Sequence, residues 1–487
     1  MTLTGHSPNK LLIVMVSLVL LPLSPKAAPS LRSVGKHIVP LHRQRVPVQG
    51  EDQVISYKSV YFGNVEVGLP EQHFSVVFDT GSGHVVLPSR ECKSETCLIH
   101  NRFNRQASKH AVDVEYDGTP VKPGAPRDQI TVAFGTGEVT GQFVLDRLCL
   151  GSVVAPPTSA AAVAAAAAAG TARLRSSGAE LALRQRANTS SSAAADPLNC
   201  VDLRMVMATE MSHEPFHAFA FDGVLGLGLD GLALAPEFSF FGMMAAQRKE
   251  LEQPSFGVFL ADSDDEHSEI SFGGHSPDRV ASPLSWAPVA SPELGYWQVQ
   301  IKALRIGNRT LDYCNDGQCR AVVDTGTSLL AVPHDFADEL MQELEGPLRD
   351  PPSSQTDGEG VDCRFAEGVP LHFDVEGATI TLMPGDYARQ AFQMEETGQE
   401  QGAKPAQGGS GSSAKPTCQP SLMPLELPEP LGPKLFIWGE PVLRKYYTVY
   451  DWGQKRIGFG LAVHSAEEDA AATEDAKKLP ARGLLFL

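Results

Sequence analysis

Hydrophobic and polar positions alternate over many short segments of the chain, and this period of two predicts strands. Residues 61–68 alternate apolar and other side chains up to a turn that begins at Pro70. Residues 74–78 form a continuous apolar run, which is typical of a buried strand. Residues 130–141 place β-branched side chains on both sides of a Gly-Thr-Gly tip and predict a hairpin. Apolar residues follow a helical spacing in 334–344, so we expect a β-dominated chain with few helices.

Two of the apolar runs end in the same tripeptide. Asp79-Thr80-Gly81 follows the run 76–78, and Asp324-Thr325-Gly326 follows the run 321–323. The glycine permits a tight turn, so each copy presents one carboxylate at the end of a strand. One copy alone would be interpreted as an ordinary turn, because Asp and Gly are common there. Two copies in matching apolar contexts predict two similar lobes that each contribute one Asp to a shared cleft.

The start of the chain has the pattern of a secretory leader. Lys10 precedes an apolar run from Leu11 to Leu23, and small residues follow it, which predicts a signal peptide over residues 1–28. The run is shorter than the roughly 20 residues of a membrane span, and an uncleaved anchor is the alternative. The basic segment 29–52 is expected to be a propeptide. It either folds over the carboxylate-lined cleft or is a solvated linker.

The remaining boundaries follow from changes in composition. The chain of 487 residues is long enough for more than one domain. We expect an N-terminal lobe with an Ala/Ser-rich insert, a C-terminal lobe with a polar insert, and a flexible charged tail. These segments are 53–281 with the insert 152–198, 282–463 with the insert 396–416, and 464–487.

Composition and charge narrow the possible partners. The net charge of −18 provides no basic field for nucleic acid, so protein or peptide partners are expected. Eight cysteines behind a secretion signal favour disulfides in a protein that is secreted or held in an acidic vesicle or vacuole. Sequons at Asn188 and Asn308 suggest a glycoprotein. The cysteines lack zinc-like spacing, so we expect no metal and no other cofactor. The acidic run 262–266 is interpreted as a solvated turn, with weak cation binding as the alternative.

Taken together, several motifs resemble those of the pepsin-like aspartic endopeptidases of the pepsin, cathepsin D and plasmepsin type. The resemblance runs from about Tyr61 to Leu461, with the inserts between. The motifs are the two Asp-Thr-Gly copies, Phe134-Gly135-Thr136-Gly137, His100 to Asn104, Phe221 to Gly228, Gly295-Tyr296-Trp297, and Tyr446 to Val449. The resemblance implies a bilobal acid protease fold with an active-site cleft between two related β lobes. It also implies a secreted zymogen that is active at acidic pH. Because one chain carries both motifs, no dimer is needed to assemble the site, and we expect a monomer.

The resemblance implies a role for each residue of the site. Asp79 and Asp324 would be the catalytic pair. Ser82 and Thr327 would bond their outer oxygens, Thr80 and Thr325 would hold the two loops together, and Gly81 and Gly326 would let the backbone approach. Phe134, Gly135 and Thr136 would close over the substrate. Val77, Phe221 and Tyr296 are weaker candidates for pocket walls, with core packing as an equal alternative.

Disulfides are likewise implied by the resemblance. It supports the pairs Cys92–Cys97, Cys314–Cys319 and Cys363–Cys418. Cys149–Cys200 is not standard in pepsin itself and is inferred as the pair that remains.

The chain departs from the family pattern at three positions. Phe134 stands where Tyr is usual, and Val86 stands where Trp is usual. In the family these two side chains share a hydrogen bond, so their joint loss leaves no buried donor without a partner and suggests an altered pocket. Gly83 replaces a commoner Ser, and we expect little effect. The alternative function is an inactive peptide-binding protein on the same fold, although both motifs are intact. A secreted structural protein would explain neither the paired motifs nor the hairpin.

Overall fold

The computed structural model of the chain describes residues 35–49, 54–135, 137–151, 199–247, 251–263, 266–352, 361–393 and 415–464. The predicted signal peptide, the insert 152–198 with its sequon, and nearly all of the insert 396–416 and of the tail lie outside these residues. Residues from Gly35 onward belong to one compact unit. The other sequon residue, Asn308, is exposed.

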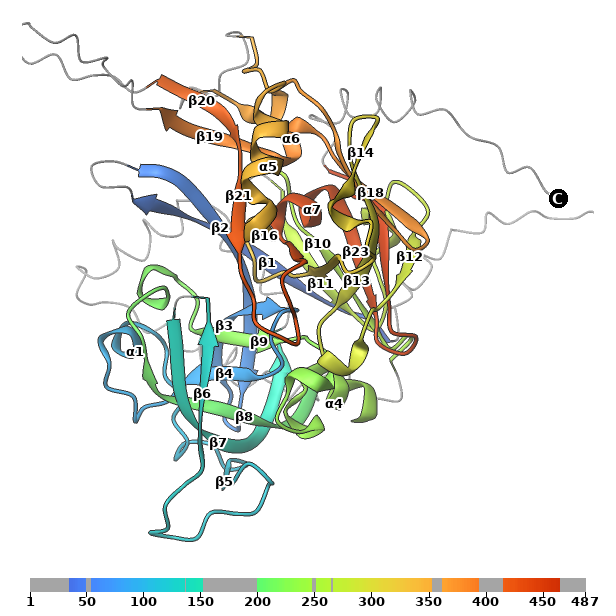
Figure 1. The fold of residues 1–487 in the computed structure, drawn as a ribbon. Coiled ribbons are helices and arrows are strands. Elements are labelled where there is room, and N and C mark those ends of the chain that lie inside the picture. Colours follow the sequence, from blue (N-terminus) through green and yellow to red (C-terminus); the bar gives the residue numbers. More distant parts are fainter. Residues whose placement is uncertain are drawn as a thin grey trace, which may run out of the picture. The chain divides into compact units, whose positions relative to one another are not determined.

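The described residues form one long sheet, a second sheet and a two-stranded ribbon (Figure 1). The strands of the long sheet, in spatial order, are β12 (Ser285–Pro288), β24 (Arg456–Leu461), β23 (Tyr446–Asp451), β10 (Ser255–Phe259), β11 (Ser268–Phe272), β1 (His37–Gln49), β2 (Val54–Val67), β3 (Gln72–Asp79), β9 (Gly223–Gly226), β4 (Val85–Pro88), β8 (Cys200–Met211), β7 (Gly137–Leu150) and β5 (Val112–Val114), with β6 (Gln129–Phe134) on β7. The sheet therefore draws strands from both predicted lobes.

The second sheet belongs to the C-terminal half of the chain. Its order is β18 (Ala378–Leu382), β17 (Leu371–Val375), β13 (Gln298–Ile306), β15 (Arg320–Val323), β22 (Leu435–Trp438), β16 (Leu330–Pro333) and β21 (Leu422–Leu425), with β14 (Arg309–Leu311) on β13. The ribbon pairs β19 (Ala388–Gln393) with β20 (Lys415–Pro420).

The helices among the described residues are short. The α-helices are α1 (Glu95–Ile99), α4 (Phe240–Gln247), α5 (His334–Glu345), α6 (Pro384–Tyr387) and α7 (Glu440–Lys445). The 3-10 helices are η2 (Phe216–Ala218), η3 (Asp230–Leu232), η4 (Pro236–Phe238), η5 (Pro277–Arg279), η6 (Pro292–Leu294), η7 (Asp312–Cys314) and η8 (Cys363–Phe365). This confirms the β-dominated fold with few helices that the pattern predicts.

The two Asp motifs lie in matching arrangements of strands. β3 pairs in parallel with β9, β9 pairs antiparallel with β4, and β4 pairs in parallel with β8. The same sequence of pairings relates β15, β22, β16 and β21 in the second sheet. The expected internal repeat is therefore present in the structure, with one copy in each sheet.

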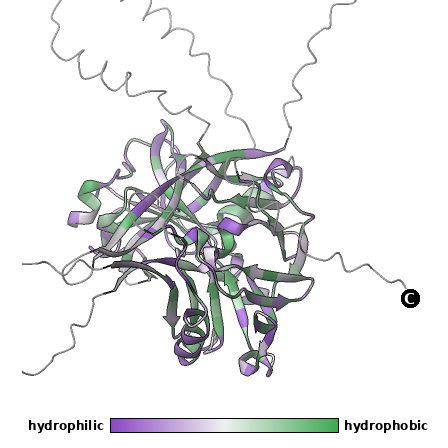
Figure 2. Ribbon diagram, turned by 90° about the horizontal axis from the view of Figure 1, so that it is seen from above, coloured by the Kyte–Doolittle hydropathy of each residue, from purple (hydrophilic) through white to green (hydrophobic). Residues whose placement is uncertain are grey.

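Burial explains why the strands that carry the motifs are continuous apolar runs. Val76 and Phe78 of β3 are buried, as are Ala321 and Val323 of β15. Strands covered on both faces need apolar side chains at every position, whereas strands with one solvated face alternate. Figure 2 shows hydrophobic and hydrophilic residues interspersed along the ribbon. The four disulfides join the expected partners: Cys92–Cys97, Cys149–Cys200, Cys314–Cys319 and Cys363–Cys418.

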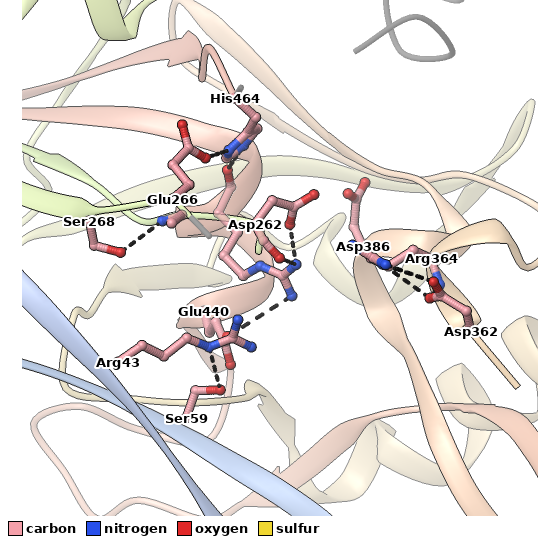
Figure 3. Close-up of polar contacts among 12 residues, drawn as sticks. Arg43, Ser59, Asp262, Glu266, Ser268, Asp362, Arg364, Asp386, Glu440 and His464 are labelled. Carbon is pink, nitrogen blue, oxygen red and sulfur yellow. Dashed lines mark hydrogen bonds and ion pairs between the residues drawn. The ribbon is translucent and has the colours of Figure 1, made fainter. Parts of the chain in front are cut away.

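The basic leader takes a position that neither sequence interpretation anticipated. Residues 37–49 are the strand β1, which lies inside the long sheet between β11 and β2. The sequence contains a pattern that could have predicted this strand, because the apolar residues Val39 and Leu41 are two positions apart. Both side chains are buried in the structure. The two residues at the ends of the acidic run 262–266, both labelled in Figure 3, form ion pairs, Asp262 with Arg444 and Glu266 with Arg279.

Candidate active site

The two aspartates stand at the carboxyl ends of β3 and β15. The main-chain carbonyl of Asp79 accepts a hydrogen bond from the Leu227 amide at 2.7 Å. The Asp324 amide donates to the Trp438 carbonyl at 3.0 Å. Each loop is therefore tied to the strand that runs parallel to its own. Asp324 is 9% exposed and Asp79 is partly buried, so both carboxylates are largely removed from solvent.

Thr80 and Thr325 join the two loops by reciprocal hydrogen bonds. The Thr80 amide donates to Thr325 Oγ1 at 3.0 Å, and the Thr325 amide donates to Thr80 Oγ1 at 3.0 Å. Each hydroxyl then donates to a main-chain carbonyl of the opposite strand, Thr80 to Val323 at 2.8 Å and Thr325 to Phe78 at 2.5 Å. Four bonds across the centre fix the two carboxylates relative to each other.

The glycines of the motifs let each loop approach the opposite carboxylate. The Gly81 amide donates to Asp79 Oδ1 and the Gly326 amide donates to Asp324 Oδ1, both at 2.9 Å. A Cβ on Gly81 would lie 2.9 Å from Asp324 Oδ1, and a Cβ on Gly326 would collide with Asp79 Oδ1. Any side chain at either position would therefore push the two carboxylates apart.

The outer oxygens of the two carboxylates differ in their hydrogen bonds. The Thr327 hydroxyl donates to Asp324 Oδ2 at 2.6 Å, as the resemblance implies. The Ser82 hydroxyl is buried without a hydrogen-bond partner among the described residues. Its proximity to Asp79 still opposes the rise in the pKa of that carboxyl. The contact between Ser82 and Asp79 is thus weaker than the hydrogen bond between Thr327 and Asp324.

Burial raises the pKa of Asp79 well above its usual range, and the Asp324 carboxylate raises it further. Two neighbouring carboxyl groups in a buried site cannot both be ionised without a large cost in free energy. At neutral and acidic pH the pair therefore holds at least one proton, a property for which aspartic proteases are the standard example.

The predicted hairpin consists of β6 and β7, with Phe134 opposite Gly137. Gly135 has φ +58°, a left-handed conformation that suits glycine in a two-residue turn. Thr136 lies outside the described residues. The Phe134 ring packs edge-on against Phe216, with 5.8 Å between ring centroids.

The expected wall residues fall into two groups. Val77, Phe221 and Val86 are buried in one apolar cluster, against which the partly buried Phe134 packs. The Phe134 and Val86 replacements therefore meet in the same apolar layer, as their joint departure from the family suggests. Burial raises the pKa of Tyr296, and the charges of Asp324 and Asp79 raise it further, so its hydroxyl lies within electrostatic reach of the two carboxylates.

Sequence reasoning missed the structural role of Asp222. This carboxylate is 3% exposed and accepts hydrogen bonds from the Ser75 amide at 2.9 Å and the Asn101 amide at 2.8 Å. The side chains of Ser75 and Asn101 also donate to it, at 3.2 and 3.0 Å. It fixes the start of β9 against β3. The available signal was an acidic residue inside the apolar, glycine-spaced run 221–228.

His84 is a second residue whose role sequence reasoning missed. It is 8% exposed, and its Nε2 accepts a hydrogen bond from the Leu234 amide at 3.1 Å. Burial lowers its pKa to about 4. It lies five residues after Asp79 and supports the loop between β9 and α4.

Within the described ranges, no cluster of His, Cys, Asp and Glu side chains is arranged to hold a metal ion. The helices of those ranges are also too short or too polar to span a bilayer.

The comparisons with known proteins agree with this geometry. A family model described as eukaryotic aspartyl protease matches residues 60–178 and 192–462. Cathepsin E of Aquarana catesbeiana is 27% identical over 422 residues, which cover 86% of this chain and 83% of the relative. Vacuolar protease A of Aspergillus fumigatus is 28% identical over 410 residues, covering 82% and 79%. Human gastricsin is 27% identical over 413 residues, covering 83% and 82%. The chain therefore belongs to the eukaryotic aspartyl protease family.

Proposed function

We propose that this protein is an aspartic-type endopeptidase that hydrolyses peptide bonds with a water molecule activated between Asp79 and Asp324. The observation that carries the proposal is the pairing of two largely buried carboxylates on loops that four threonine hydrogen bonds hold together. A raised pKa on one of two facing carboxyl groups separates an acid from a base within a single site.

The reaction needs no covalent intermediate. The ionised carboxylate accepts a proton from the water, whose oxygen attacks the peptide carbonyl carbon. The protonated carboxyl group donates its proton to the carbonyl oxygen, which gives a neutral tetrahedral diol. Collapse of the diol breaks the C–N bond. The amine leaves with the proton that the base had accepted, and one diol hydroxyl returns its proton to the other carboxylate as the new carboxyl group forms. The pair then again carries one proton, as it did before the reaction.

The hairpin and the wall residues would hold the substrate. Phe134 and Gly135 lie at the tip of β6–β7, and closure of this hairpin would exclude water from the pair. Tyr296 would line the cleft beside the carboxylates. With Phe134 and Val86 both apolar, the wall beneath the hairpin suits an apolar substrate side chain better than a hydrogen-bonding one.

The proposal also covers how the protein is made and the pH at which it works. We propose that the protein enters the secretory pathway, is made as a zymogen, and acts at acidic pH in a vesicle, in a vacuole or outside the cell. The raised pKa of Asp79 supports activity at acidic pH, because the pair keeps its proton there. The repeated motif in one chain provides both carboxylates, so a monomer suffices.

Cleavage of denatured globin between pH 3 and pH 7, with and without pepstatin, tests the proposal. We expect cleavage that is strongest at acidic pH and is blocked by pepstatin. The alternative function is a peptide-binding protein that does not cut. Absence of cleavage after acid treatment, with retained binding of pepstatin, would contradict the endopeptidase and favour this alternative.

A further inference from the structure

Trp297 belongs to the Gly295-Tyr296-Trp297 motif, yet the proposed function gives its side chain no role. It directly precedes β13 and is 0% exposed. Its ring packs edge-on against Tyr450, with 5.3 Å between ring centroids, and against Phe256, with 5.9 Å. These contacts fix the plane of the indole, and therefore the direction in which its N–H group points.

The indole N–H of Trp297 holds the loop of the first aspartate through one intermediate residue. It donates to the Leu227 carbonyl at 2.8 Å, and the Leu227 amide donates to the Asp79 carbonyl at 2.7 Å. Leu227 is also 0% exposed, and a buried carbonyl is costly when it has no donor. Of the large apolar side chains, an indole suits this place because it offers a donor and needs no donor in return.

The main chain of Trp297 holds the strand of the second aspartate. Its carbonyl accepts a hydrogen bond from the Val323 amide at 2.8 Å. Val323 is the last residue of β15 and directly precedes Asp324. Trp297 is therefore bonded to residues that hold or adjoin both aspartates, one from each half of the chain.

The segments on the two sides of the indole bond are packed closely. The Leu229 amide donates to the Gly295 carbonyl at 2.8 Å. Gly295 has φ +85°, and a Cβ there would collide with the Leu232 amide nitrogen. We call residues 227–232 together with residues 295–297 the joint, because they join the two halves of the chain beside the catalytic pair.

The joint also contacts the loop that follows the first aspartate. The Gly228 amide donates to the Ser82 carbonyl at 2.8 Å. A Cβ on Gly83 would lie 2.5 Å from the Leu232 carbonyl oxygen. Gly83, one of the three departures from the family pattern, therefore makes room for the joint, and any side chain there would push the joint away.

We infer that Trp297 is a positioning residue of the reaction, whose indole N–H fixes the Asp79 loop at the distance from Asp324 that the catalytic pair needs. The threonine bonds hold the two loops at their centre, and the joint holds the Asp79 loop from its side. The inference rests on the proposed function, because the position of the pair matters only if the pair acts on a substrate. The alternative is that Trp297 only fills the core.

Trp297→Phe keeps an aromatic ring in the core and removes the N–H group. We expect kcat for a peptide substrate at acidic pH to fall at least tenfold, with KM within about threefold of wild type. A small displacement of a reacting group costs more in the transition state than in substrate binding, which is why kcat carries the effect.

The dependence of kcat on pH gives a readout that core packing would not change. Burial and the charge of Asp324 raise the pKa of Asp79. A loop that moves away from Asp324 and toward water loses part of both effects. We therefore expect the alkaline limb of the profile to lie at lower pH in Trp297→Phe than in wild type.

Trp452→Phe is the matched control. Trp452 packs in the same aromatic cluster, with 6.1 Å between its ring centroid and that of Trp297, and its amide donates to the Pro254 carbonyl. We expect its kcat and its pH profile to match those of wild type within about twofold. Equal changes in kcat and in the pH profile for the two variants would overturn the inference and leave Trp297 as a core residue.

A variant that reaches the same joint by a milder change covers the case in which Trp297→Phe does not fold. Leu232 is partly buried, and its Cδ1 lies 2.6 Å from where a Cβ on Gly228 would be. Leu232→Ala is expected to change kcat and the pH profile in the same direction. Leu234→Ala, at a position that is 46% exposed, is its control. Wild-type values in Leu232→Ala would overturn the inference.

Hydrogen–deuterium exchange of the full chain separates this inference from the proposed function. We expect peptides that contain residues 79–84 to exchange at least tenfold faster in Trp297→Phe, or in Leu232→Ala, than in wild type and the control variants. Peptides from β17 should exchange alike in all of them. Unchanged exchange at residues 79–84 would overturn the inference. A wild-type protein that cleaves no peptide, with the expected exchange pattern in the variants, would count against the proposed function alone.

Discussion

At the scale of single residues, the site is less symmetric than its two motifs. Thr327 bonds Asp324, while the Ser82 hydroxyl is buried without a partner among the described residues. Phe134 and Val86 contribute to one apolar cluster. The resemblance to the family implies a hydrogen-bonded Tyr and Trp at these two positions. Both differences change the surroundings of the carboxylates and leave the carboxylates themselves in place.

Because Val86 and Phe134 belong to the same apolar layer, we expect substitutions at the two positions to have non-additive effects on the free energy of unfolding. Val86→Trp puts a large ring and an indole N–H at a site that is 2% exposed, so we expect it to lower the free energy of unfolding by about 2–5 kcal/mol. Adding Phe134→Tyr provides an acceptor and should restore about 1 kcal/mol. Urea unfolding of both single variants and the double variant measures this coupling.

Val86→Leu is the matched control, since it enlarges the side chain without adding a donor. We expect it to cost less than Val86→Trp and to show no coupling to Phe134→Tyr. Equal coupling for the Trp and Leu variants would show that size, and not the hydrogen bond, links the two positions.

His84 predicts how stability changes with pH. Its pKa is about 4 in the folded protein against 6.5 in the unfolded chain, so between these values the unfolded chain binds the proton and the folded protein does not. The free energy of unfolding therefore falls as pH drops from 6.5 to 4, by about 3 kcal/mol from this residue. His84→Gln keeps an acceptor for the Leu234 amide and removes the titration, so it should flatten the dependence.

The measurement is the urea midpoint of wild type and variant at several values between pH 4 and pH 7. The exposed His267 provides the control, and the His267→Gln variant is expected to show the same slope as wild type. A His84→Gln protein with the same slope as wild type would rule out this residue as the source.

At the scale of elements, the β6–β7 hairpin depends on a single backbone conformation. Gly135 has φ +58°, and no other atom lies within 4 Å of the place where a Cβ would be. A substitution there tests backbone strain alone. Gly135→Val should strain the turn by about 1–2 kcal/mol and lower kcat/KM by about tenfold, because the hairpin must close over the substrate.

Gly135→Asn is the control, since Asn tolerates the left-handed conformation. We expect its kcat/KM to stay within about threefold of wild type. If the Val and Asn variants had the same kcat/KM for a peptide substrate, the conformation of the turn would have no part in substrate closure.

The elements also show what the sequence could and could not predict. The strands before Asp79 and Asp324 and the hairpin at Phe134 are local patterns, and they were predicted. The site roles of Thr80 and Thr325 came from the family resemblance. The position of β1 was not predicted, because its partners Ser268–Phe272 and Glu440 lie far along the chain. Residue type alone does not distinguish a partly buried arginine such as Arg43 from a solvated one.

At the scale of the whole molecule, the repeated motif and the repeated strand order have one consequence. Each half provides one carboxylate, and the threonine bonds make the two halves interdependent. The long sheet, with β1 at its centre, runs through strands of both predicted lobes. The catalytic unit is therefore the whole folded unit and not either half. The lobe boundary near residue 281 stays a prediction.

The most direct test of the central claim is kcat/KM for one peptide substrate at acidic pH with Asp79→Asn, Asp324→Asn and the double variant. Groups that act as one unit are strongly non-additive. We predict that each single variant loses at least about 10⁴-fold and that the double variant loses no more than either single. Circular dichroism would confirm that all three proteins are folded. If either single variant kept activity within tenfold of wild type, the two aspartates would not form one catalytic pair.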